Sequence, residues 1–93
     1  MIRTFADRRT KAVFEDVPVK GIGHDVRRSA RKKLLMLDHA TSLADLRVPP
    51  NNRLEALKGN REGQDSIRIN DQFRICFEWR ERHAREVEIT DYH

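Results

Sequence analysis

The sequence holds a single cysteine, few aromatic residues and no long apolar run. Cys76 stands alone among 93 residues, which excludes an internal disulfide and is typical of a protein of the reducing cytoplasm. No stretch approaches the roughly 18 apolar residues that cross a bilayer, so neither a membrane segment nor a cleaved secretion signal is expected. The four glycines and three prolines form no low-complexity segment or linker. We therefore expect one soluble cytoplasmic domain over residues 1–93.

Charged side chains, in contrast, are abundant. They make up 37% of the chain, against 38% for hydrophobic residues, so a core is expected beneath a heavily charged surface. Lys and Arg outnumber Asp and Glu by 19 to 15, for a net charge of +4. This basic balance admits RNA, DNA or an acidic protein as a partner. A basic nucleic-acid-binding module without enzymatic activity is therefore one open interpretation.

The N-terminal half shows helical periodicity in two places. Apolar residues recur at helical spacing over residues 10–17, and again over residues 26–37 after a cap at His24 or Asp25. Residues 2–5 alternate between apolar and polar and predict a short first strand, while residues 42–46 predict one further helical turn. Pro49 and Pro50 then indicate an irregular loop.

The C-terminal half alternates with the period of strands over residues 54–57, 66–70, 73–79 and 84–90. Residues 70–72 suit a tight hairpin connection. Phe73, Ile75, Phe77 and Trp79 share the face that is expected to point into the core. Helices followed by an antiparallel meander predict an α+β fold with the helices packed on the sheet.

Two arginines fall on the opposite face of these strands. Arg74 interrupts a run of large apolar residues, and it shares a sheet face with Arg68 if the hairpin pairs as predicted. Two guanidinium groups on one face would make an anion-binding site. Alternatively, both arginines form cross-strand ion pairs with Glu78, Glu86 and Glu88. The sequence leaves both interpretations open.

Glu55 and Lys58 lie at the end of the first meander strand, beside a turn bracketed by Gly59 and Gly63. That turn can bring Lys58 round toward Glu55. An exposed ion pair of this kind contributes only about 0–1 kcal/mol to stability. The two residues are therefore either an ordinary surface pair or part of a functional site.

Basic residues also line one face of the predicted helix over residues 26–37, namely Arg27, Arg28, Arg31 and Lys32. This face is either solvated or in contact with phosphates, where it would add salt-sensitive affinity without specifying a base. The histidines and the cysteine show no zinc-ligand spacing, and no glycine-rich phosphate loop or serine nucleophile motif is present. The sequence thus predicts neither a metal site nor a cofactor site.

The final predicted strand leads directly to Asp91, Tyr92 and His93. Histidine titrates near neutral pH, with an ordinary pKa of about 6.5, and is the usual proton donor or acceptor in catalysis. His93 is therefore either part of an active site or a solvated side chain beside Tyr92.

Three motifs occur together in this chain: NRLEALKG over residues 52–59, SIRINDQFRICF over residues 66–77, and DYH over residues 91–93. Together they resemble the HigB-like toxins, plasmid-maintenance killer proteins of the RelE/ParE toxin superfamily. The resemblance implies a compact RelE-like, microbial ribonuclease-like fold with helices packed on a curved antiparallel sheet. It also implies ribosome-dependent cleavage of mRNA and a helix-turn-helix antitoxin of the HigA type, through which alone operator DNA would be reached.

The resemblance carries over to five positions that these toxins use: Lys58, Arg74, Asp91, Tyr92 and His93. At Glu55 the chain departs from HigB-like toxins that carry histidine there. It resembles instead other toxins of the superfamily, which place a glutamate in a Glu-x-Leu-Lys setting and pair it with a late histidine.

Metal-free RNA cleavage needs a base for the attacking 2′-hydroxyl and an acid for the leaving 5′-oxygen. Glu55 is the expected base and His93 the expected acid. Arg74, with Lys58 nearby, would stabilise the charge that builds on the phosphoryl oxygens.

The remaining candidates would hold the RNA. Tyr92 would stack on or hydrogen-bond a nucleotide, and Asp91 would orient the terminal segment. Further phosphate contacts are expected from Arg68, Arg27 and Arg31. A gyrase-inhibiting toxin of the ParE kind is the alternative within the superfamily, and it would need no acid–base pair.

Overall fold

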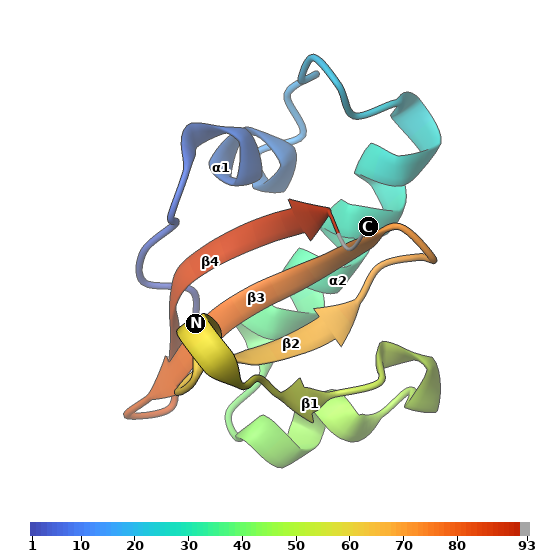
Figure 1. Ribbon diagram of the computed structural model, residues 1–93. Helices are drawn as coiled ribbons and strands as arrows, with labels where there is room; N and C mark the ends of the chain where they lie inside the picture. The colour runs from blue at the N-terminus through green and yellow to red at the C-terminus, as the bar shows by residue number, and fades with distance from the viewer. Residues whose placement is uncertain (92–93) are drawn as a thin grey trace.

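The structure has two layers, a four-stranded antiparallel sheet and the helices that cover one of its faces (Figure 1). The computed structural model describes residues 1–91. Each strand pairs with the next along the chain, in the order β1-β2-β3-β4. This meander confirms the predicted α+β class, with helices packed on a curved sheet. The elements in chain order are α1 (Arg8–Phe14), α2 (His24–His39), η1 (Leu43–Arg47), η2 (Pro50–Asn52), β1 (Glu55–Ala56), η3 (Gly59–Arg61), β2 (Asp65–Arg68), β3 (Phe73–Arg80) and β4 (His83–Asp91), where η marks a short 3-10 helix.

The core lies between the sheet and α2. Ile67 of β2, Ile75 of β3 and Ile89 of β4 are directly opposed in register. They belong to one buried cluster with Leu34 and Leu37 of α2, and each of the five is at most 1% exposed. Burying a side chain of this size contributes about 1.5–3 kcal/mol. The predicted helical and strand periodicities of these segments are thus confirmed by the packing.

The N-terminal segment covers the outer edge of β4. Ile2 and Phe5 form isolated bridges, parallel to β4, with Ala84 and Val87. Between the two bridges, Glu86 adopts a left-handed conformation with φ of 51° where the pairing of β3 with β4 shifts register. The predicted strand over residues 2–5 is therefore wrong as a continuous strand. The irregularity of β4 at Glu86 interrupts the pairing, so that two separate bridges form.

α1 secures the last part of β4. The fully buried Thr10 accepts a hydrogen bond at its Oγ1 from the backbone N–H of Ile89, at 2.9 Å. Arg9 Nη2 donates to the backbone carbonyl of Ile89 at 3.0 Å. These two side chains take the place of a further strand partner at the edge. The strand that leads toward residues 92–93 is thus held on both sides shortly before it ends.

The limits of α1 differ from the predicted helix at both ends. Asp7 caps the helix, because its Oδ1 accepts the N–H of Thr10 at 2.7 Å. The helix stops at Phe14, and Asp16 then takes a positive φ of 62°. Val17 is 48% exposed. The prediction of a helix over residues 10–17 missed both the aspartate cap and this early left-handed turn.

α2 begins one residue earlier than its predicted cap. Gly23 is the N-cap and makes no side-chain hydrogen bond, so the predicted caps His24 and Asp25 are the first two helical residues. The negative charge of Asp25 in the first turn still interacts favourably with the positive end of the helix dipole. After the helix, Ser42 and Asp45 form a capping box that begins η1. The predicted turn at residues 42–46 is confirmed.

Candidate active site

The sheet face that points away from α2 carries two rows of polar side chains in register. The first row runs Glu55, Ser66, Cys76 and Glu88 across the four strands, and the second runs Arg68, Arg74 and Thr90 across the last three. Successive side chains of a strand point to opposite faces, so both rows lie opposite the apolar Ile67–Ile75–Ile89 row. Arg68 and Arg74 therefore share a sheet face, as the sequence predicted. Glu55 lies on the same face.

Arg74 is the most enclosed charged group on this face. Its side chain is 7% exposed. Nε donates to Ser66 Oγ at 2.8 Å, and Nη2 donates to the carbonyl oxygen of Arg53 at 2.7 Å and to that of Ser66 at 3.3 Å. A buried guanidinium requires such acceptors because desolvation penalises an unmatched charge. Arg74 is thus a buried positive charge on this face, held in place by its hydrogen bonds.

Glu55 approaches this guanidinium from the edge strand β1. Its Oε1 lies 3.9 Å from Arg74 Nη2, and its side chain is 50% exposed. Glu55 is directly opposed to Ser66 in the β1–β2 pairing. The carboxylate therefore sits over a buried cation while its other side faces solvent.

Lys58 stands at the rim of the face. It is the N-cap of η3, the turn that follows β1, and it is exposed. As the sequence predicted, Gly59 and Gly63 bracket this turn, and both have positive φ angles, of 68° and 93°. Among residues 1–91, the ion pair that Glu55 forms is with Arg74 and not with Lys58. The turn itself lies over the sheet on the side away from α2, in yellow in Figure 1.

Arg61 fastens this turn to the sheet. Its Nη2 lies 3.1 Å from Glu88 Oε1 in β4, and its Nη1 donates to Gln64 Oε1 at 3.0 Å. Because Glu88 is in the polar row that begins with Glu55, this pair spans the face from β4 to the β1–β2 connection. This ion pair therefore holds the turn that carries Lys58 against the sheet.

Arg68 is opposed to Arg74 in register but turns toward the hairpin, where it pairs with Asp71. Within residues 1–91, neither arginine pairs with Glu78, Glu86 or Glu88, so the alternative of cross-strand pairs with these glutamates is wrong. The structure thus pairs each arginine with an acid other than those the sequence suggested. The hairpin at residues 70–72 is formed as predicted, with Asn70 Oδ1 accepting the N–H groups of the two following residues, 72 and 73.

Asp91 ends β4 directly opposite Phe73, and its Oδ2 accepts a hydrogen bond from Gln72 Nε2 at 3.1 Å. Thr90, one residue earlier, is opposed to Arg74. The predicted site residues Tyr92 and His93 lie outside the described residues. The described part of β4 therefore runs past Arg74 and ends two residues before His93.

Arg27 and Arg31 are on a different side of the molecule. Arg31 Nε donates to the carbonyl oxygen of Phe14 at 3.1 Å, and Arg27 Nε lies 3.9 Å from Asp16 Oδ1. Both arginines thus join α2 to the end of α1, on the layer that faces away from Glu55. The structure does not bring them together with the polar sheet face.

The sequence pattern missed four residues that shape this site: Ser66, Arg53, Asn52 and Lys33. Asn52 is fully buried, and its Oδ1 accepts a hydrogen bond from Lys33 Nζ at 2.5 Å. Lys33 is 8% exposed, and its burial, together with the nearby charges of Lys32 and Arg68, lowers its pKa from the ordinary value of 10.5. Of these four, only Lys33 had a sequence signal for its burial, because it lies at helical spacing beside the apolar residues of α2.

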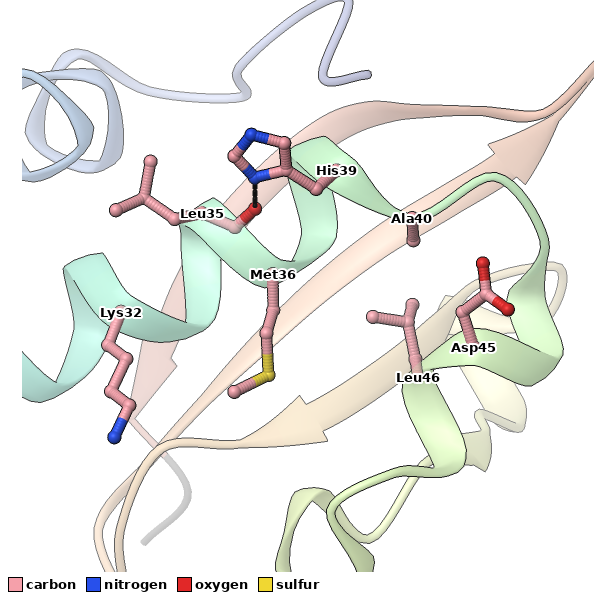
Figure 2. A pocket seen from close by; sticks show the side chains of 7 residues that line it. All are labelled: Lys32, Leu35, Met36, His39, Ala40, Asp45 and Leu46. Atoms are coloured by element: carbon pink, nitrogen blue, oxygen red, sulfur yellow. Dashed lines mark hydrogen bonds between the residues drawn. The ribbon is translucent and has the colours of Figure 1, made fainter.

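A separate hollow of about 450 Å³ lies between α2 and η1. Figure 2 shows its apolar lining of Leu35, Met36 and Leu46, with Lys32 and Asp45 at its two ends. It belongs to the helical layer and not to the polar sheet face. Across residues 1–91, no three His, Cys, Asp or Glu side chains gather as metal ligands would, and no helix is long and apolar enough to span a membrane.

This fold is shared with a known class of protein. Two solved structures of the YoeB–YefM complex from Staphylococcus aureus match, one of them described as a heterotetrameric toxin–antitoxin complex. In each the TM-score is 0.63 and the identity 16%, over 100% of this chain and 98% of the other. At this identity the likeness establishes the fold, which is one that occurs in toxin–antitoxin complexes.

Sequence relationships then define the family. A family model described as RelE-like toxin of type II toxin-antitoxin system HigB matches residues 3–93, and the chain belongs to this HigB-like toxin family. It is 39% identical to Toxin HigB-1 of Vibrio cholerae serotype O1 over 85% of this chain and 84% of that protein. It is 33% identical to Endoribonuclease HigB of Proteus vulgaris over the full length of both. The predicted family is confirmed.

Proposed function

We propose that this toxin is a metal-independent endoribonuclease that cleaves mRNA on the ribosome. The observation that carries the proposal is the Glu55 carboxylate, half exposed, held 3.9 Å from the buried guanidinium of Arg74 on one sheet face. A base beside a fixed cation is what an attack on a phosphodiester requires. The name of the Proteus vulgaris relative, an endoribonuclease, supports the same activity.

In the proposed reaction, Glu55 takes the proton of a 2′-hydroxyl as that oxygen bonds to the adjacent phosphorus. The bond from phosphorus to the 5′-oxygen breaks, and His93 gives that oxygen a proton. Arg74 stabilises the negative charge on the phosphoryl oxygens, and Lys58 adds to it from the rim. The products are a 2′,3′-cyclic phosphate and a 5′-hydroxyl. Because side chains supply both acid and base, the chemistry needs no metal ion.

The other candidates hold the substrate and the terminal segment. Tyr92 holds a nucleotide by stacking or hydrogen bonding, and Asp91 orients the segment that carries the acid. Arg68 contacts phosphate near the hairpin. Arg27 and Arg31, on the helical layer, contact phosphates of a larger RNA surface rather than the scissile one.

We propose as partners the ribosome, its mRNA and a helix-turn-helix antitoxin of the HigA type, with operator DNA reached only through that antitoxin. These partners place the protein in the cytoplasm, without a membrane role. A small basic domain gains from a second surface that orients the RNA, since positioning supplies much of the rate.

The test is to incubate the toxin with naked mRNA and with the same mRNA in programmed ribosomes, and to analyse the ends that form. Rapid cleavage on ribosomes alone, leaving 2′,3′-cyclic phosphate ends, is the expected result. Equal cleavage of both substrates would remove the ribosome from the proposal. Inhibition of gyrase supercoiling without RNA cleavage would favour the ParE kind of toxin, and RNA binding without cleavage a non-enzymatic module.

A further inference from the structure

The guanidinium group of Arg74 is held at two of its nitrogens. Nε donates to Ser66 Oγ at 2.8 Å, while Nη2 donates to the carbonyl oxygens of Arg53 at 2.7 Å and Ser66 at 3.3 Å. Ser66 is 0% exposed, so water does not compete for the two contacts that Arg74 makes with Ser66. Because a guanidinium is planar, fixing two nitrogens also fixes the direction of the third.

Ser66 occupies the strand position between the two proposed catalytic residues. It is directly opposed to Glu55 in β1, and its hydroxyl bonds to Arg74 in β3. The spacing between carboxylate and guanidinium therefore depends on one residue of β2. A serine suits this position because its short side chain leaves the guanidinium room to lie against the sheet.

The second acceptor, the Arg53 carbonyl, belongs to a loop that is held in place by the buried side chain of Asn52. Arg53 has left-handed dihedral angles, φ 45° and ψ 54°, which turn its carbonyl toward Arg74. The preceding Asn52 accepts from Lys33 Nζ at 2.5 Å and donates through Nδ2 to the carbonyl of Leu46 at 3.1 Å. Buried hydrogen bonds of this kind fix a turn because breaking them leaves polar groups unsatisfied.

We infer that Ser66 is a positioning residue that orients Arg74 toward the phosphoryl oxygens of the scissile phosphate. The inference rests on the proposed ribonuclease function. An arginine that is already oriented needs no reorganisation when charge develops in the transition state. A serine that only filled buried space would affect stability and leave the rate of the folded enzyme unchanged.

The closing experiment compares Ser66→Ala with Cys76→Ala. The two residues are directly opposed and buried, and each substitution removes one heavy atom from the same sheet face. In single-turnover cleavage on programmed ribosomes, Ser66→Ala is expected to lower the maximal rate by about 10–100-fold. The toxin concentration for half-maximal rate should not change. Cys76→Ala should keep the wild-type rate, and Ser66→Thr, which restores a hydroxyl, should recover most of it.

A spectroscopic measurement separates this inference from the proposed function. The Nε–H proton of Arg74 should exchange slowly with water in the NMR spectra of the wild type and Cys76→Ala, and rapidly in Ser66→Ala. A folded Ser66→Ala protein that cleaves at the wild-type rate, or that keeps a slowly exchanging proton, overturns the inference. If Ser66→Ala does not fold, the shape-matched pair Ser66→Thr and Ser66→Val provides the same comparison. A wild-type protein that cleaves no mRNA overturns the proposed function instead, while the exchange rates still decide whether Ser66 holds Arg74.

Discussion

Glu55 and Arg74 lie 3.9 Å apart, from Oε1 to Nη2, although their strands are not neighbours in the sheet. The strand between them, β2, contributes Ser66, which is opposed to Glu55 and bonded to Arg74. The cation is enclosed and the carboxylate is half exposed. A substrate would therefore approach this pair from the side of the half-exposed Glu55 carboxylate.

Glu55→Gln should leave the fold intact and lower ribosome-dependent cleavage by about 10²–10⁴-fold, the usual contribution of a general base. Glutamine keeps the shape of the side chain but cannot accept the proton. Single-turnover cleavage and thermal unfolding would be measured side by side. Glu62→Gln, an exposed glutamate in the next turn, is the matched control and should behave as wild type. Wild-type cleavage by folded Glu55→Gln would show that another group accepts the proton.

Arg74→Lys should lower cleavage by about 10²–10³-fold, the cost of losing one preorganised donor in a charge-stabilising site. Lysine keeps the positive charge but not the planar fork, so it cannot satisfy both Ser66 and the Arg53 carbonyl. Leaving a buried acceptor unsatisfied costs about 1–3 kcal/mol, and a lower urea midpoint is expected as well. Arg85→Lys, on β4, controls for the loss of a guanidinium from the sheet. A folded Arg74→Lys protein with normal cleavage would exclude a role for the fork geometry.

The fold was predictable wherever one periodicity dominated. Leu34 and Leu37 followed the helical period, and Ile67 and Ile75 followed the strand period, because each buries its side chain in the single core cluster. The opposition of Arg68 and Arg74 came from the hairpin register. The end of α1 was not predictable in the same way, since Asp16 reverses the backbone there for reasons that apolar spacing does not record.

The site was predictable only in part. Glu55 and Arg74 were predicted as candidates, but the contacts that the structure gives them were not, because these contacts depend on how distant segments meet. Ser66 reads as an ordinary polar strand residue, and nothing local indicates that it is buried under a guanidinium. Asn52 reads as part of a polar loop, yet its contact with Lys33 buries it completely. Such polar residues are fixed by tertiary contacts, which single-residue preferences do not encode.

Asp65→Asn should stabilise the protein at neutral pH. Burial raises the pKa of the Asp65 carboxyl above its ordinary 3.8, so the folded protein holds this proton more tightly than the unfolded chain does. The stability that the protonated Asp65 contributes is therefore present below pH 3.8 and is lost as the pH rises through the raised pKa. Urea unfolding from pH 7 down toward pH 4 should show the advantage of Asp65→Asn shrinking as the pH falls. Glu81→Gln, at an exposed turn, should show no such trend, and a constant advantage for Asp65→Asn would contradict the explanation by burial.

Removing His93 should abolish toxicity while leaving the fold in place. Among residues 1–91, the last member of the buried core cluster is Ile89 and β4 ends at Asp91, so the loss of residue 93 should cost no more than about 0.5 kcal/mol. Imidazole is the side chain best suited to donate a proton near neutral pH, and Thr90, near the end of β4, is directly opposed to Arg74. The test is growth arrest on expression without antitoxin, for the protein ending at Tyr92 and for His93→Gln, with soluble yield and thermal midpoint measured in parallel. His39→Gln, an exposed histidine at the end of α2, should remain fully toxic. Growth arrest by either folded His93 variant at the wild-type level would mean that the leaving 5′-oxygen takes its proton from another donor.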